Sequence, residues 1–125
     1  MKKILIVDDE PNIVMSLEYT FKKNNFEVFI ARDGQEALDI LKTAHPDIII
    51  LDVMMPNVDG YNTLEQIKNN KSLKNTKVIF LSAKNKEKDI EKGLALGADL
   101  YMTKPFSLKK LVEHVNELTN LTKPI

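Results

Sequence analysis

The sequence predicts an α/β fold with a doubly wound, five-stranded parallel sheet and helices on both faces. Three observations support this prediction. Short aliphatic runs recur along the chain, stretches with helical spacing separate them, and each stretch is long enough to connect one strand to the next. Because such crossovers are almost always right-handed, the strands should lie parallel in one sheet.

The expected strands are five aliphatic runs, at residues 4–7, 28–31, 48–51, 78–81 and 100–102. Runs without alternation are typical of parallel strands, because helices cover such strands on both faces.

The first two helices are expected after the first and second strands. Pro11 suits the first helical position, and apolar residues then repeat every four positions until Asn24 and Asn25 interrupt the pattern. The second helix opens at Asp33 and ends before Pro46, since the residue ahead of a proline disfavours helical geometry.

The other helices follow the third, fourth and fifth strands. The third is expected over residues 61–69, and the polar segment 70–76 is expected to form an exposed loop. The fourth ends at Gly97, and Ser107 caps the fifth, whose apolar residues form one stripe. The lysines around the fourth helix are expected on a solvated face: Lys84, Lys86, Lys88 and Lys92.

Length and composition limit the class of protein. The 125 residues fit one domain, 1–125, in which residues 118–125 complete the last helix and could begin a linker. Eighteen basic residues balance eighteen acidic ones, and Arg32 is the sole arginine, so direct nucleic-acid binding is not expected. The absence of cysteine excludes disulfides, thiolate nucleophiles and zinc-thiolate sites.

No segment is expected to enter a membrane. The aliphatic run 4–7 follows two lysines but stops at Asp8, which makes it too short for a signal peptide, and no other run approaches the length of a span. We expect a soluble, cytoplasmic protein without membrane contact.

Acidic residues follow two of the expected strands. The run 48–51 ends in Asp52, and the run 4–7 ends in Asp8-Asp9-Glu10. Ligands of open α/β sheets bind outside the carboxyl ends of the strands, so Asp52 is expected to be presented at that edge rather than buried. If the two strands are neighbours, Asp8, Asp9 and Asp52 converge.

Such a convergence favours a magnesium-dependent phosphoryl acceptor. Mutual repulsion of the carboxylates is relieved by a hard cation, and Mg2+ prefers oxygen ligands while keeping positions for water and a substrate phosphate. Ser82 ends the run 78–81, and Lys104 follows the last strand. A hydroxyl and an ammonium group can stabilise the oxygens of a phosphoryl group transferred to Asp52.

Five separated segments carry a resemblance to a known family, in that family's order: Val7-Asp8-Asp9-Glu10, Leu51-Asp52-Val53-Met54-Met55-Pro56, Asp59-Gly60, Leu81-Ser82-Ala83 and Lys104-Pro105-Phe106. Over essentially its whole length the chain resembles the receiver domain of two-component response regulators. The resemblance implies a flavodoxin-like (βα)5 fold with the strand order 2-1-3-4-5.

The resemblance also implies roles for the acidic residues. Asp52 is similar to the phosphate acceptor, Asp9 and Asp52 to the ligands of Mg2+ together with the carbonyl of Met54, and Asp8 to the residue that holds metal-bound water. Glu10 is expected to be a solvated or capping acid near the site rather than a ligand. The Met54 side chain is expected to serve in packing.

Other implied roles concern the last two strands. Ser82 and Lys104 resemble the phosphate-sensing pair, and the Lys104–Pro105 peptide bond matches one that is cis in the family. Tyr101 resembles the aromatic switch residue, which swings inward when Ser82 moves toward the phosphoryl group.

The implied function is phosphorelay signalling. The donor would be a phosphohistidine on a sensor histidine kinase or a histidine phosphotransfer protein. The surface of the fourth helix, last strand and fifth helix would bind a downstream effector. Such a domain catalyses its own phosphorylation and dephosphorylation and is not a turnover enzyme.

Two departures from relatives are notable. Some receivers dimerise through two adjacent acids before the last strand and an arginine on the last helix. In this chain Asp99 is followed by Leu100 rather than by a second acid, and His114 aligns with that arginine. We therefore expect a monomer or weak dimer. Met54 and Lys84 occupy positions that, in this family, flank the path of the water that attacks the phosphoryl group. These two residues predict slow self-dephosphorylation.

Three other functions stay open. An aspartate-nucleophile phosphatase needs two acids separated by one residue after its nucleophile strand, whereas Asp8 and Asp9 are adjacent. A flavodoxin-like nucleotide binder needs a small-residue loop where this chain has acids that repel an anion. A phosphate-independent docking module would not need the intact acid set.

Overall fold

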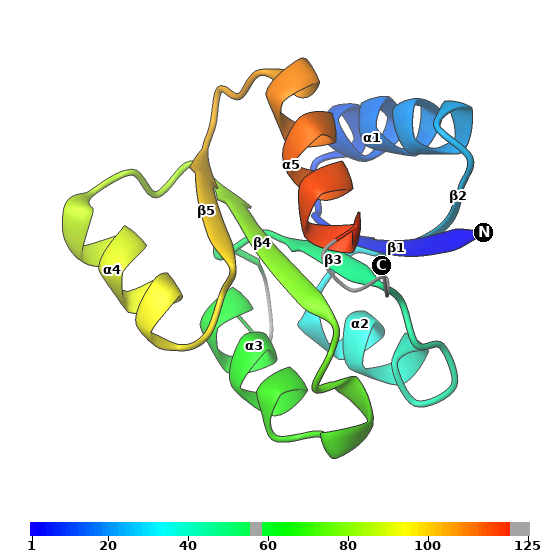
Figure 1. Ribbon diagram of the computed structural model, residues 1–125. Coiled ribbons are helices and arrows are strands. Elements are labelled where there is room, and N and C mark those ends of the chain that lie inside the picture. The colour runs from blue at the N-terminus through cyan, green and yellow to red at the C-terminus, as the bar shows by residue number, and fades with distance from the viewer. Residues whose placement is uncertain (56–58, 121–125) are drawn as a thin grey trace.

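The computed structural model describes residues 1–55 and 59–120, which form a three-layered α/β structure (Figure 1). Its strands are β1 (Lys2–Val7), β2 (Phe26–Ala31), β3 (Ile48–Leu51), β4 (Lys77–Ser82) and β5 (Leu100–Thr103). They pair in parallel in one sheet with the order β2-β1-β3-β4-β5. The fold class and the strand order 2-1-3-4-5 are thereby confirmed.

Helices lie on both faces of this sheet. Helices α1 (Pro11–Lys23) and α5 (Leu108–Asn120) cover one face, and α2 (Gly34–Ile40) and α3 (Gly60–Lys68) cover the other (Figure 1). Helix α4 (Glu87–Ala95) lies beside β5, at the edge of the sheet (Figure 1).

The centre of the sheet is buried from both sides. Because successive side chains of a strand point to opposite faces, Ile49 and Leu51 join the apolar cluster under α2 and α3, whereas Ile48 and Ile50 join the cluster under α1 and α5. None of these four side chains is more than 2% exposed. The aliphatic run therefore fixes β3 firmly and places the residue after it, Asp52, at a defined point.

The helix boundaries follow the signals in the sequence. The Asp33 carboxylate accepts a hydrogen bond from the N–H of Glu36 (2.9 Å) at the start of α2, and the Ser107 hydroxyl accepts one from the N–H of Lys110 (3.2 Å) at the start of α5. Gly97 follows α4 with a φ of +113°, which favours glycine. The expected caps are confirmed at these positions.

Two local predictions differ from the structure. Regular α2 ends at Ile40, and the chain continues in tighter turns, with the N–H of Thr43 donating to the carbonyl of Ile40 at 3.2 Å. The segment 70–76 is not simply an exposed loop, because it contains a 3-10 helix, η1 (Lys71–Leu73), whose Leu73 is 2% exposed. One apolar side chain among polar neighbours anchors the segment in the core.

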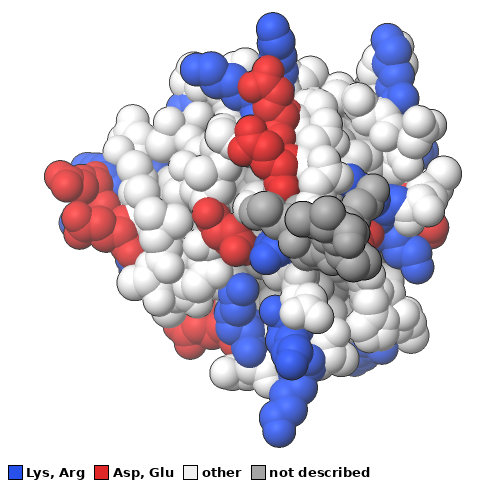
Figure 2. Space-filling model, viewed as in Figure 1, with Lys and Arg blue, Asp and Glu red and all other residues white. Residues whose placement is uncertain are grey.

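Charged side chains of both signs are interspersed over the face seen in Figure 2. This distribution agrees with the equal numbers of basic and acidic residues. Within the described residues, no helix is long and apolar enough to cross a membrane.

Candidate functional site

Carboxylates follow two neighbouring strands at the carboxyl edge of the sheet. Strand β1 pairs directly with β3, so Asp8 lies beside Asp52. The ladder continues past both strands, because the N–H of Asp8 donates to the carbonyl of Ala31 (3.1 Å) and that of Asp52 to the carbonyl of Val7 (3.0 Å). Backbone pairing thus holds both carboxylates in place.

Lys104 brings the end of β5 to these carboxylates. Its Nζ lies 3.0 Å from Asp8 Oδ2, 3.3 Å from Asp52 Oδ2 and 2.8 Å from Glu10 Oε1. The side chains of Lys104, Asp8 and Asp52 are 11%, 4% and 5% exposed. One ammonium group therefore bridges carboxylates from three places in the sequence.

The burial of Asp52 corrects the expectation that this residue is presented rather than buried. Asp52 is only 4% exposed. Its Oδ1 accepts a hydrogen bond from the N–H of Met54 at 3.1 Å, while Lys104 contacts Oδ2. The strand-end position was predicted correctly, but the chain that follows β3 and the lysine after β5 enclose the carboxylate.

The protein environment shifts the pKa values of two of these groups. Burial raises the pKa of Asp8 above its ordinary value of 3.8, and the nearby Asp52 adds to this effect, whereas hydrogen bonds from the Glu10 N–H and Lys104 oppose it. Burial lowers the pKa of Lys104, but hydrogen bonds to Glu10 and Asp8 and the charge of Asp52 outweigh burial and raise it overall. Lys104 is therefore a permanent cation next to the carboxylates.

Three carboxylates in this arrangement could hold a metal ion. Asp8, Glu10 and Asp52 each offer an oxygen, and these oxygens lie within 4.8 Å of one another. Hard carboxylate oxygens at this spacing suit Mg2+, which takes a few protein ligands and keeps several waters. The donor set of the chain therefore fits the Mg2+ that is expected from the sequence.

The membership of this group differs from the expected ligand set. Glu10 stands at the N-cap of α1 with a side chain 55% exposed, as expected of a solvated or capping acid, and its carboxylate also belongs to the group. Asp9, expected as a direct ligand, is not among the clustered acids of the described chain, but it lines the pocket beside Asp8 and a second pocket with Met54. The Met54 side chain is 55% exposed, so its expected role in packing is wrong.

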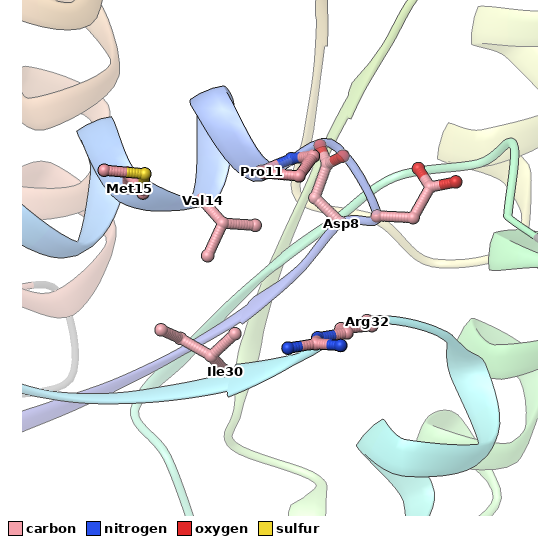
Figure 3. Close-up of a pocket in the computed structure, with 7 residues that line it drawn as sticks. Asp8, Pro11, Val14, Met15, Ile30 and Arg32 are labelled. Atoms are coloured by element: carbon pink, nitrogen blue, oxygen red, sulfur yellow. The ribbon is translucent and has the colours of Figure 1, made fainter.

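A pocket of about 390 Å³ borders the site between α1 and β2 (Figure 3). Val14 and Ile30 face each other across it, and Arg32 lies at the same end as Asp8 (Figure 3). The buried acid cluster therefore adjoins an opening at the molecular surface.

Ser82 occupies the end of β4, between the acids and the last strand. Its side chain is fully buried, and its Oγ accepts a hydrogen bond from the N–H of Lys84 at 3.2 Å. Its carbonyl accepts a hydrogen bond from the N–H of Lys104 at 2.9 Å. The backbone at Ser82 thus ties the loop after β4 to the lysine that contacts the acids.

Tyr101 of β5 reaches the same loop. Its hydroxyl donates to the carbonyl of Lys84 at 2.8 Å, and its ring lies 5.6 Å from that of Phe80. Burial raises the pKa of Tyr101 to about 12. The peptide bond between Lys104 and Pro105 is cis.

The fold and the acid cluster at its carboxyl edge define a flavodoxin-like receiver. Residues 4–116 match the sequence profile of the response regulator receiver domain, and the chain belongs to this family. It is a two-component signalling module rather than a metabolic enzyme. The residues from 56 to 58, including Pro56 of the motif, lie outside the described residues.

Two curated relatives share 44% of their aligned residues with this chain. One is the alkaline phosphatase synthesis transcriptional regulatory protein PhoP of Bacillus subtilis, over 117 residues that make up 94% of this chain and 48% of PhoP. The other is protein PilG of Pseudomonas aeruginosa, over 88% of this chain and 82% of PilG. The chain therefore spans about half the length of PhoP and most of PilG.

Solved structures agree with this assignment. The receiver domain of Francisella response regulator 1452 superposes with a TM-score of 0.91 at 37% identity, covering 98% of this chain and all of that one. The Vibrio cholerae chemotaxis protein CheY4 superposes with a TM-score of 0.88 at 30% identity, covering 94% of this chain and 98% of that one.

Proposed function

We propose that the chain is a Mg2+-dependent phosphoryl acceptor in a phosphorelay, with Asp52 as the acceptor. The observation that carries the proposal is the position of the Lys104 ammonium, 3.3 Å from Asp52 Oδ2 and 3.0 Å from Asp8 Oδ2. A buried carboxylate beside a permanent cation and a second carboxylate is suited to receive an anionic group.

In the proposed reaction, an Asp52 oxygen attacks the phosphorus of a phosphohistidine on a sensor histidine kinase or histidine phosphotransfer protein. The phosphorus–nitrogen bond breaks, the donor histidine keeps the electron pair, and Asp52 becomes an acyl phosphate. Lys104 and the Ser82 hydroxyl then stabilise the phosphoryl oxygens. Positioning and charge neutralisation supply nearly all the catalysis of such a transfer.

The proposed Mg2+ ligands are Asp9, Asp52 and the carbonyl of Met54, with Asp8 holding metal-bound water. Glu10 joins this set as a neighbour, because its carboxylate belongs to the acid cluster. When bound, the cation neutralises charge that develops on the phosphoryl oxygens.

The proposed output is a change of the α4-β5-α5 surface, where a downstream effector binds. Tyr101 is the switch residue in this proposal, and its hydrogen bond to the carbonyl of Lys84, two residues after Ser82, supports that role. The domain, residues 1–125, acts as a monomer or weak dimer in the cytoplasm, without direct nucleic-acid or membrane binding. It catalyses its own phosphorylation and dephosphorylation and does not turn over a substrate.

Intact mass spectrometry tests the acceptor chemistry. The protein is incubated with acetyl phosphate, with and without Mg2+, alongside Asp52→Asn as the matched control. We expect one phosphoryl group to be added to the unaltered protein only when Mg2+ is present, and none to Asp52→Asn. Equal addition to both proteins would overturn the assignment of Asp52.

Further assays separate the alternatives. Sustained release of phosphate from a phosphomonoester would support an aspartate-nucleophile phosphatase. A folded protein that binds Mg2+ but accepts no phosphoryl group from acetyl phosphate or a phosphohistidine protein would support a docking module. A flavodoxin-like nucleotide binder would bind nucleotide without Mg2+.

The lifetime of the phosphoryl group is a further prediction. The exposed Met54 cannot orient an attacking water, and Lys84 lines the same pocket. We expect slower loss of the phosphoryl group than in a double variant, Met54→Asn with Lys84→Glu. Decay followed by intact mass checks this, and equal decay rates would contradict it.

A further inference from the structure

Helix α4 rests on aromatic rings with its backbone rather than with large side chains. Gly93 is the sole residue of α4 that is buried, and Leu94 is 44% exposed. A Cβ added at Gly93 would lie 2.9 Å from ring carbons of both Phe80 and Tyr101. The position of α4 therefore depends on how these rings are placed.

The rings form a row beneath α4 that begins on helix α3. Tyr61 lies edge-on to Phe80 with ring centroids 5.6 Å apart, and Phe80 lies 5.6 Å from Tyr101. Tyr61 is 6% exposed, and Phe80 is fully buried. Three elements, α3, β4 and β5, thus contribute one ring each to the support of α4.

Two tyrosine hydroxyls in this row donate to backbone carbonyls at the start of α4. Tyr101 donates to the carbonyl of Lys84 in the loop before the helix (2.8 Å), and Tyr61 donates to the carbonyl of Asp89 in its first turn (3.1 Å). Lys92 lies one turn further, with its Nζ 4.3 Å from the centre of the Tyr61 ring. Tyr61 therefore contacts α4 at two points on one side of the helix.

The residue before Tyr61 packs against the backbone of Asp52 and Val53. The preceding residue, Gly60, donates from its N–H to the carbonyl of Val53 at 2.9 Å. A Cβ on Gly60 would overlap the carbonyl oxygen of Asp52 and would lie 2.7 Å from the Cα of Val53. The start of α3, which carries Tyr61, is thus packed directly against the backbone of Asp52 and Val53.

We propose that Tyr61 is a second positioning residue for α4, which transmits shifts of the Asp52 backbone to the first turn of α4 in parallel with Tyr101. The proposal rests on the proposed function, because it takes Asp52 as the acceptor and α4 as part of the output surface. Tyr61 acts through α3, whereas Tyr101 acts through β5 and the loop after Ser82. The effector surface therefore has two inputs from one site.

The state of the Tyr61 hydroxyl agrees with this role. Burial raises the pKa of Tyr61 above its ordinary value, and the charge of Asp89 raises it further. This direction agrees with the geometry, in which the hydroxyl donates to the carbonyl of Asp89. Lys92 is exposed, as expected of a solvated helix face, and its ammonium also contacts the Tyr61 ring.

Hydrogen exchange of the α4 amides, residues 87–95, tests the contact in the unmodified protein. Tyr61→Phe removes the hydroxyl and keeps the ring, Tyr101→Phe does the same on β5, and Tyr19→Phe is the control, since Tyr19 is 69% exposed on α1. We expect α4 amides to exchange roughly two- to tenfold faster in Tyr61→Phe, as loss of one hydrogen bond predicts. Exchange in α5 should be unchanged.

Treatment with acetyl phosphate and Mg2+ then tests transmission. Intact mass gives the phosphorylated fraction, so exchange is compared at equal fractions. We expect phosphorylation to change α4 exchange in the unaltered protein, Tyr61→Phe and Tyr101→Phe each to lose part of that change, and the double variant to lose more than either.

The outcomes separate this proposal from the proposed function. If Tyr61→Phe matches the unaltered protein in both states, Tyr61 only fills space and the inference is overturned. If α4 of Tyr61→Phe exchanges faster before treatment but responds fully to phosphorylation, the contact exists and transmission is overturned. If no protein gains a phosphoryl group, the proposed function and the transmission fail together, while exchange in the unmodified protein still decides the contact.

Discussion

Strand β3 at the centre of the sheet and strand β5 at its edge differ sharply in packing. All four residues of β3 are buried, whereas all four residues of β5 are only partly buried. Helices cover β3 on both faces, while α4 beside β5 buries only a glycine. Regions with few buried apolar contacts open at the lowest free energy. The acids therefore stand on the stable part of the molecule, and the proposed output surface lies on the adjustable part.

The largest expected loss of stability comes from a residue of β3, at the centre of the sheet. Ile49→Ala removes a fully buried side chain, and we expect the free energy of unfolding to fall by about 3–5 kcal/mol. The matched change at the edge, Leu94→Ala, should cost less than about 1 kcal/mol. Urea denaturation of both variants measures this difference. Similar losses would show that the two regions are equally well packed.

Lys104 ties the edge strand to the central acids, and its replacement should be the next most damaging change. Lys104→Met leaves the buried Asp8 and Asp52 without their cation. We expect a loss of about 2–3 kcal/mol at pH 7, since breaking a largely buried ion pair strands its charged partners. Urea denaturation checks this expectation, with Lys42→Met as an exposed control, and a neutral effect would contradict it.

Replacement of Asp8 should raise the free energy of unfolding rather than lower it. Because the pKa of Asp8 is raised in the folded protein, its ionisation costs stability above that pKa, and the cost disappears as the pH falls toward the ordinary value of 3.8. In the absence of metal, we expect Asp8→Asn to raise the free energy of unfolding by about 0.5–2 kcal/mol at pH 7. Gains of this size are common when a functional residue is replaced. Urea denaturation across pH 3 to 7 should show the gain shrinking as the pH falls; a gain independent of pH would refute the explanation.

The smallest change in stability is expected at Gly93, in the helix beside the edge strand. Alanine is a better helix former than glycine by about 1 kcal/mol, but the new Cβ would crowd two rings, and overpacking costs about 1–3 kcal/mol. We expect a net loss of about 1 kcal/mol for Gly93→Ala and faster hydrogen exchange confined to α4. A more stable variant would mean that the rings yield easily.

Much of the scaffold follows from local sequence signals. The aliphatic runs predict all five strands, and most clearly β3, because a strand covered on both faces has no polar positions. The convergence of Asp8 and Asp52 follows as well, since the carboxyl ends of neighbouring parallel strands meet at one edge. Signals that act within one turn can also be recognised from the sequence alone, such as Gly97, which marks the end of α4.

The remaining features depend on contacts between distant segments. The buried Asp52 contacts Lys104, which lies far away in the sequence. Glu10 could have been suspected, because it follows two acids directly, but its contact with Lys104 depends on the path of α1. Nothing in the local pattern around Tyr61 distinguishes a ring that supports another helix from an ordinary core residue. Long-range packing decides these cases.

The close packing at the start of α3 also limits which residue can occupy the first position of this helix. Position 60 has no room for a methyl group, because the backbone of the residues after β3 occupies that space. Any larger residue there would lift α3 away from the sheet, whatever the chemistry of the acids. Related chains with the same geometry should therefore keep glycine at this position for a steric reason, even where the acceptor carboxylate has been lost.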